Sequence, residues 1–171
     1  MAREIFEHRT QLVDAVQVAI DDPDAYVKDR PWMGGADRDD LGWEALIDQM
    51  QEPCDAGENR LVTFDWQASP DWIREGVQWL IHCFTDYGPS WDWFDARVAD
   101  LIEKGWDSGD IAYNLLKECG QRSLEIGLAL ISFTRGDSNE VMATNMHQAD
   151  LIVDLATQAG HGRDIVVLRR T

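Results

Sequence analysis

Apolar residues in the first fifty positions recur at helical spacing. In "IFEHRTQLVDAVQVAI", residues 5–20, they share one helical face, and this spacing predicts an amphipathic first helix. The acidic "DDPD" ends that helix and starts a short second one at residues 24–28. After a loop over residues 29–40, Asp39 or Asp40 is placed to cap a third helix through "LGWEALIDQM".

The middle of the chain contains one extended run followed by three helical ones. The run "RLVTFDW" is rich in β-branched and aromatic residues and predicts the first strand. Ser69 and Pro70 open the helix "DWIREGVQWLIHCF", and Trp72 is expected on its buried side. Ser90 is expected to cap the helix "WDWFDARVADLIEKGW", and "DIAYNLLKECG" predicts another helix that ends at Gly120.

From Arg122 the pattern becomes extended. "LEIGLALISF", "EVMATNM" and "DIVVLR" predict strands, and the polar loop "TRGDSN", with Gly136 as a turn position, joins the first two as a hairpin. Between the second and third lies a helix, "HQADLIVDLATQAG", which is expected to end at Gly160. We therefore predict one α+β domain over residues 1–171. It has a mostly antiparallel sheet of about four strands, helices on one face, and a strand-strand-helix-strand tail.

Acidic residues dominate the charge. The 171 residues contain 32 Asp and Glu against 15 Lys and Arg, a net charge of -17. Nucleic acids and anionic membranes are disfavoured partners, because binding them requires clusters of Lys and Arg. A cationic protein would instead be attracted and oriented. Since residues 1–100 hold 22 of the acids and only 8 of the bases, we expect such a partner to meet that part of the chain.

Candidate chemistry is sparse. Cys54, Cys83 and Cys119 form no disulfide or zinc pattern, which favours a reducing, cytoplasmic location. The spacing of Asp37, Asp39 and two later residues imitates a calcium loop only in part, so helix capping and a solvated loop explain it better. The chain shows no phosphate loop, nucleophile elbow or zinc-protease motif. We expect no cofactor, no metal and no enzymatic activity.

Eight tryptophans carry more information than these motifs. Trp66, Trp72 and Trp79 are expected in the core or at its edge. On a helical projection from Trp91, an apolar arc contains that residue together with Phe94, Val98, Leu101 and Ile102. Trp93 falls on the opposite, charged side with Arg97, Asp100 and Lys104. Either Trp93 faces a partner, or a neighbouring segment covers it.

Several stretches together resemble a known protein family. "DDPDAYVKD", "LGWEALIDQM", "LVTFDWQASPDWI" and "LALISFTRGDSNEVMATNMHQADLIVDLATQAG" follow the order and pattern of a bacterial family of small acidic proteins classed as a domain of unknown function. Such proteins are similar in character to the immunity and accessory proteins encoded beside secreted toxins. The resemblance implies a structural likeness and assigns no catalytic residue.

These features predict a cytoplasmic binding protein, of the kind that protects a bacterium by occluding a basic toxin such as a nuclease. Two other classes stay open. One is a small-molecule enzyme with a pocket between sheet and helices, near Cys83 or His147. The other is a homo-oligomeric regulatory module. A hot-spot role for Trp93 predicts that Trp93→Ala weakens partner binding with little change in stability. The expected partner contacts are Asp37, Asp39, Asp40, Trp43, Asp92, Trp93, Asp95 and Asp100.

Overall fold

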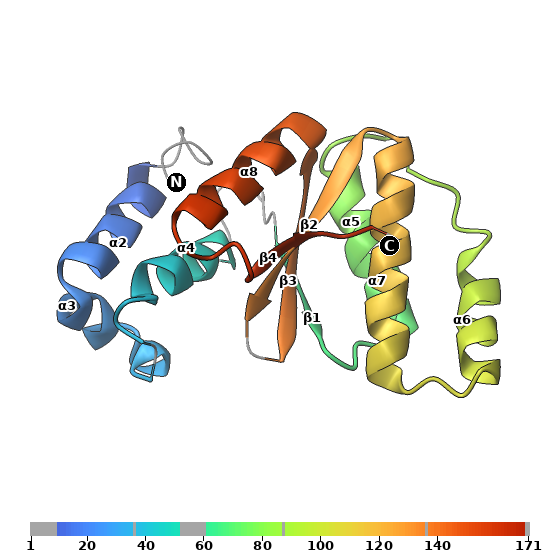
Figure 1. Cartoon of the computed structure of the whole chain (residues 1–171), viewed down its shortest axis with the longest axis horizontal. Coiled ribbons are helices and arrows are strands. Elements are labelled where there is room, and N and C mark those ends of the chain that lie inside the picture. The colour runs from blue at the N-terminus through green and yellow to red at the C-terminus, as the bar shows by residue number, and fades with distance from the viewer. Residues whose placement is uncertain (1–9, 36, 52–60, 87, 136, 170–171) are drawn as a thin grey trace. The chain divides into compact units, whose positions relative to one another are not determined.

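A computed structural model (Figure 1) describes most of the chain. The described residues are 10–35, 37–51, 61–86, 88–135 and 137–169. They fall into two compact units, Met1–Asn59 and Arg60–Thr171, which are described separately below. The expectation of a single domain stays a prediction. No helix within the described residues is long and apolar enough to cross a membrane.

The first unit consists of short helices. They are α2 (Thr10–Asp21), α3 (Pro23–Lys28), the 3-10 helix η1 (Pro31–Met33) and α4 (Leu41–Gln51). Asp22 caps α3 by accepting a hydrogen bond from the Ala25 amide at 3.1 Å, and the proline at the first position of that helix needs no such partner. Helices α2 and α4 pack closely, because a Cβ on Gly42 would lie 2.7 Å from Ile20 Cγ1. The early part of the predicted first helix, residues 5–9, lies outside the described residues.

The second unit is built on a four-stranded antiparallel sheet. Its strands are β1 (Val62–Asp65), β2 (Leu128–Arg135), β3 (Ser138–Asn145) and β4 (Ile165–Val167), and their order is β1-β3-β2-β4. The β2–β3 pair is the predicted hairpin, with Leu128 opposite Asn145 and Arg135 opposite Ser138. Gly136, expected in its turn, lies outside the described residues. The predicted α+β class and antiparallel sheet are confirmed.

Four helices complete this unit. They are α5 (Pro70–His82), α6 (Phe94–Glu103), α7 (Ser108–Glu125) and α8 (Met146–Gln158). Helices α5 and α7 cover one face, and α8 covers the other (Figure 1). The prediction that helices lie on one face is therefore wrong in this detail. The physical reason is that β2 is buried continuously from Leu128 to Phe133, so both of its faces need apolar cover.

The larger core lies between the sheet and α5, α6 and α7. Phe64 and Phe94 are fully buried in it, together with apolar residues of all three helices. The tryptophans expected in the core or at its edge lie at the edge. Trp66, Trp72 and Trp79 are 50%, 47% and 39% exposed. Trp72 nonetheless packs near Phe64, with ring centroids 6.3 Å apart, and its indole donates a hydrogen bond to the Thr63 carbonyl at 3.2 Å.

Helix α7 extends beyond Gly120, the residue at which the sequence predicted its end. The predicted end at Gly120 is wrong, and the helix continues to Glu125. Gly120 is there because the C-terminal segment crosses α7 at this point. A Cβ on Gly120 would lie only 2.2 Å from the Leu168 carbonyl oxygen. The conformation typical of a glycine helix stop occurs later, at Gly127, where φ is +79°.

Candidate functional site

The tryptophan-rich start of α6 is arranged differently from the expected helix. Ser90 does not cap it. The Ser90 hydroxyl accepts from the Asp92 amide at 3.3 Å and donates to the Asp92 carboxylate at 2.8 Å, in a turn before the helix. Helix α6 begins only at Phe94, and its N-cap is Trp93. A helical projection therefore does not describe Trp91, because that residue precedes the helix.

Trp93 is half-buried and has partners on several sides. Its ring stacks on Trp91 with centroids 6.2 Å apart, and it meets Phe94 edge-on at 5.2 Å. The Arg122 guanidinium carbon, from α7, lies 4.3 Å from its ring centroid. Its indole N–H donates to the Ser90 carbonyl at 2.9 Å. Of the two alternatives left open by the sequence, the structure therefore favours cover by neighbouring segments.

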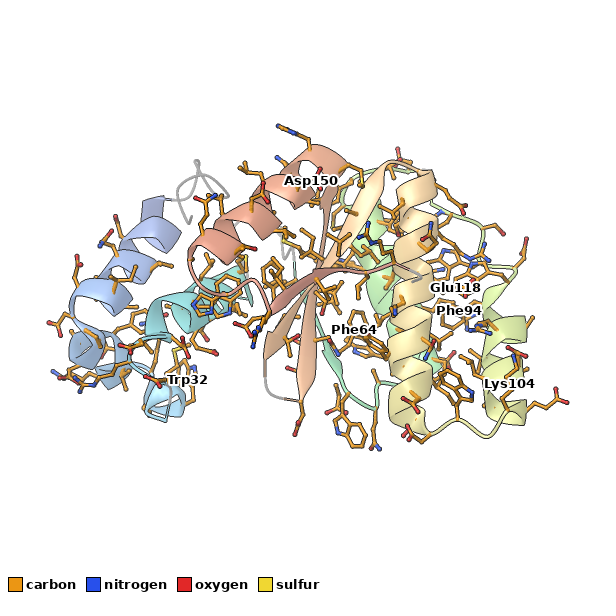
Figure 2. All side chains as sticks on the ribbon, in the orientation of Figure 1. Trp32, Phe64, Phe94, Lys104, Glu118 and Asp150 are labelled. Atoms are coloured by element: carbon orange, nitrogen blue, oxygen red, sulfur yellow. The ribbon has the colours of Figure 1, made fainter. Side chains whose placement is uncertain are left out.

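A chain of ion pairs joins α6 to α7 beside this aromatic cluster. Arg97 bonds to Asp100 at 2.6 Å, and its Nε lies 3.5 Å from Glu118 Oε2. Arg122 bonds to Glu118 at 3.1 Å. Glu118 is buried, and Figure 2 shows it with Phe94 between the two helices. Because a buried carboxylate requires compensating charge, these pairs hold α6 on α7.

Asp100 is the titratable group most affected by this arrangement. Lys104 bonds to its carboxylate at 2.8 Å, and Arg97 approaches it from the preceding turn. The hydrogen bond from Lys104 is the main cause that lowers the pKa of Asp100 below its ordinary value. Partial burial acts in the opposite direction, and the charges of Lys104 and Arg97 lower it further. The Asp100 carboxylate is therefore paired with Arg97 in α6 and with Lys104, the C-cap of that helix.

The other two acids of the second unit that were expected to contact a partner, Asp92 and Asp95, are exposed, but they have different partners within the chain. Asp95 bonds to Arg74 at 3.0 Å, and Arg74 also bonds to Asp71 at 2.9 Å. Asp92 is held by the Ser90 hydroxyl. The structure thus brings Asp92, Trp93 and Asp95 together at the start of α6. Their contacts are with this unit itself.

The candidates of the first unit lie in and after the turn that precedes α4. Asp37, Asp39 and Asp40 are all exposed. The Asp37 carboxylate accepts from the Asp39 amide at 3.1 Å, and its carbonyl accepts from the Asp40 amide. Trp43, in contrast, is only 6% exposed. It therefore does not belong to the accessible candidates, because its position in the first turn of α4 faces the core.

Within the parts of the chain that the structure describes, residues suited to catalysis or metal binding do not converge. Cys83 is exposed at the end of α5, whereas Cys119 is buried in α7. Burial, and to a smaller extent the neighbouring Glu118, raises the pKa of the Cys119 thiol, so this thiol stays protonated. His161 pairs with Asp164 at 3.0 Å. Within the described part of the chain, no three His, Cys, Asp or Glu side chains gather as a metal site.

A groove that the sequence did not reveal runs along β4. It measures about 630 Å3 and lies between α7 and α8. The lining residues include Tyr113, Lys117, Asp150 and Asp154, but neither Cys83 nor His147. The sequence carries little indication of this groove, because the residues that line it come from helices that are distant along the chain. Their common feature is a position on the helix faces next to a short strand, where Tyr113, Asp150 and Asp154 are exposed and Lys117 is half-buried.

Comparison with known proteins is informative only about the family. No curated protein and no solved structure matches the chain. The model of a family described as a domain of unknown function, DUF6630, matches residues 1–166. The predicted resemblance to a domain of unknown function is confirmed at this level, while the likeness to immunity proteins stays a prediction. The chain belongs to the DUF6630 family.

Proposed function

We propose that this chain is an acidic binding protein that captures a cationic protein, in the manner of a cytoplasmic immunity protein that occludes a basic toxin such as a nuclease. The observation that carries the proposal is the exposed carboxylate surface of the first unit. Its members are Asp14, Asp21, Asp22, Asp24, Asp29, Asp37, Asp39 and Asp40. Lys28 and Arg38 are the exposed bases among the described residues of 10–51, and Arg38 is paired with Asp24.

An excess of exposed carboxylates favours rapid association with a basic protein. Charges at the surface attract an approaching partner over a distance of about 8–10 Å at moderate ionic strength. They raise the association rate constant more than they slow dissociation. The acidic surface of residues 10–51 supports this role because its exposed carboxylates outnumber the two exposed bases, Lys28 and Arg38, among the described residues of that segment.

The start of α6 contributes less than the sequence suggested. Trp93 is packed under Arg122, and Asp95 and Asp100 are paired with arginine or lysine. A partner would have to displace these pairs before it could use the residues. We therefore assign capture of the partner to the first unit. Among the candidate contacts near α6, Asp92 is exposed before the helix and stays accessible to a partner.

The test compares two variants of equal charge. In the first, Asp37, Asp39 and Asp40 are replaced by asparagine, which retains the turn hydrogen bonds. In the control, Glu75, Glu103 and Glu125, exposed on the second unit, are replaced by glutamine. Wild-type protein is used to capture partners from its native cells, and a retained protein is identified by mass spectrometry. Its association rate is then measured with all three forms.

We expect a basic partner whose association with wild type slows steeply as salt rises from about 0.05 to 0.5 M. The Asp→Asn variant should associate about tenfold more slowly at low salt, and the Glu→Gln control should stay close to wild type. An association rate that is indifferent to salt contradicts the proposal. So does an equal loss in both variants, since that would reflect net charge rather than this surface.

A further inference from the structure

The free edge of β4 suggests a second binding site. Among the described residues, strand β4 stands at the end of the sheet and pairs with β2 on one side only. The Leu168 amide donates to the Leu130 carbonyl at 2.8 Å, and the Thr134 amide donates to the Asp164 carbonyl at 2.7 Å. In an antiparallel pair, such bonds recur at every second residue. The N–H and C=O groups of Ile165 and Val167 therefore point away from β2.

This edge is accessible within a groove rather than on a flat surface. Helices α7 and α8 lie on the two sides of β4 (Figure 1), and the groove of about 630 Å3 follows the strand between them. Apolar side chains on all three elements remain open to solvent. Tyr113 is 49% exposed, Met146 is 42% and Val166 is 46%. An unpaired strand edge beside exposed apolar side chains is the arrangement that binds extended peptides by strand addition.

The two rims of the groove differ in charge. Asp150 and Asp154 lie one helical turn apart on α8, so they share a face of that helix. Asp150 is labelled on α8 in Figure 2. Lys117 lies on α7, at the opposite rim, and Arg169 follows β4 at one end of the groove. A strand in this groove would direct alternate side chains toward the two helices.

The register decides which side chains meet the acids. Leu168 approaches α7, as its contact with Gly120 shows, so Ile165 and Val167 face the α8 side by alternation. Residues of an added antiparallel strand that bond to Ile165 and Val167 have side chains on that same face. These are the side chains that approach Asp150 and Asp154. Basic residues at these positions, with apolar residues between them toward α7, complement the groove.

We propose that the groove between α7 and α8 binds an extended segment of a partner protein, which adds to β4 as an antiparallel fifth strand and places basic side chains toward Asp150 and Asp154. A second copy of this chain fits less well. Antiparallel pairing of two β4 edges about a two-fold axis brings α8 next to its own copy, and so sets these acids against each other. The site consists of residues of the second unit, whereas the carboxylate surface consists of residues of the first, so either proposal can fail alone.

The probe is a capped pentapeptide of sequence VKVKV. Its lysines supply the basic side chains, and their backbone groups are those that would bond to β4. Two methylated forms have the same charge and composition. One carries N-methyl groups on both lysines, which blocks the edge that faces β4. The other carries them on the central and last valines, which blocks only the outer edge. Binding to the full chain is followed by amide NMR shifts and by titration.

We expect the parent peptide and the valine-methylated form to bind with similar affinity and to shift the amides of Ile165 and Val167. The lysine-methylated form should bind at least tenfold more weakly. Replacement of Asp150 and Asp154 by asparagine should also weaken binding of the parent peptide, by about fivefold or more. The matched variant with Glu75→Gln and Glu103→Gln should bind as wild type does, because these exposed acids lie away from the groove.

Three results would overturn the inference. The first is equal binding of both methylated peptides, since attraction would then depend on side-chain charge alone. The second is a set of shifts confined to residues 10–51, or no binding at millimolar peptide. The third is a dimer in sedimentation experiments whose β4 amides are protected from exchange, which would assign this edge to a second copy. A loss of capture by the Asp37, Asp39 and Asp40 variant with intact peptide binding would leave this site in place.

Discussion

Trp93 shows how one residue's role depends on where its helix begins. The projection places it on the charged side with Arg97, Asp100 and Lys104, and leaves open whether a partner or a neighbouring segment covers it. In the structure the cation over its ring is Arg122, which belongs to α7. Because α6 starts at Phe94, the preceding turn brings Trp91 and Trp93 together in a stacked pair against the core.

Trp93→Ala should therefore destabilise the second unit by about 2 kcal/mol, since it removes contacts with two aromatic rings and a guanidinium. This differs from the small stability change expected of a hot spot exposed to solvent. The measurement is the free energy of unfolding in urea. Trp106→Ala is the control, because Trp106 is 41% exposed and should cost less than about 1 kcal/mol. Equal losses would show that Trp93 is no better packed than Trp106.

Asp100 predicts a specific dependence of stability on pH. Its pKa in the folded chain is lowered, chiefly by the hydrogen bond from Lys104. A lowered pKa stabilises the fold at pH values above the pKa of the unfolded chain, and this contribution is lost as pH falls through the folded value. Asp100→Asn should therefore flatten the loss of stability between about pH 5 and pH 3.

The measurement compares urea unfolding of Asp100→Asn and wild type across that range, at low salt. Asp86→Asn, which changes an exposed carboxylate elsewhere on the unit, serves as control and should follow wild type. If the two variants have the same pH profile, the pairs with Lys104 and Arg97 do not contribute to stability in solution.

Element boundaries depended on contacts as well as on local signals. Ser69 caps α5 as predicted, because its hydroxyl accepts from the Trp72 amide at 3.3 Å. Ser90 and Gly120 carry equally good local signals, yet Ser90 lies in a turn and Gly120 lies inside a helix. At Gly120 the residue type reflects the approach of Leu168, which is 48 positions away along the chain.

Gly120→Ala should be strongly destabilising, by about 3 kcal/mol, because its Cβ would meet a backbone carbonyl that cannot rotate away. Gly109→Ala, in the first turn of the same helix, is the control. There the Cβ would meet the half-exposed indole of Trp66, which can shift, and alanine has the better helix propensity. We expect a change within about 1 kcal/mol. Thermal unfolding of both variants measures the difference, and similar midpoints would contradict the close approach of Leu168.

Across the whole molecule, the carboxylate surface proposed for capture and the groove at β4 belong to different units. The exposed carboxylates of residues 10–51 support capture of a cationic protein, whereas the groove at β4 lies wholly in the second unit. The composition alone predicts attraction to basic partners, because net charge acts at long range and needs no particular fold. It does not predict a strand edge with two flanking helices, which exists only once β4 has paired with β2.

The order of elements, the antiparallel hairpin and the α+β class follow from local patterns in this chain, because hydrophobic periodicity and turn chemistry act between near neighbours. The cover of Trp93, the place of Gly120 within α7, the burial of both sheet faces and the edge groove do not. Each of these arises from contacts between residues far apart in the sequence. Such contacts are set by how the helices pack on the sheet, and a single sequence pattern carries no direct record of them.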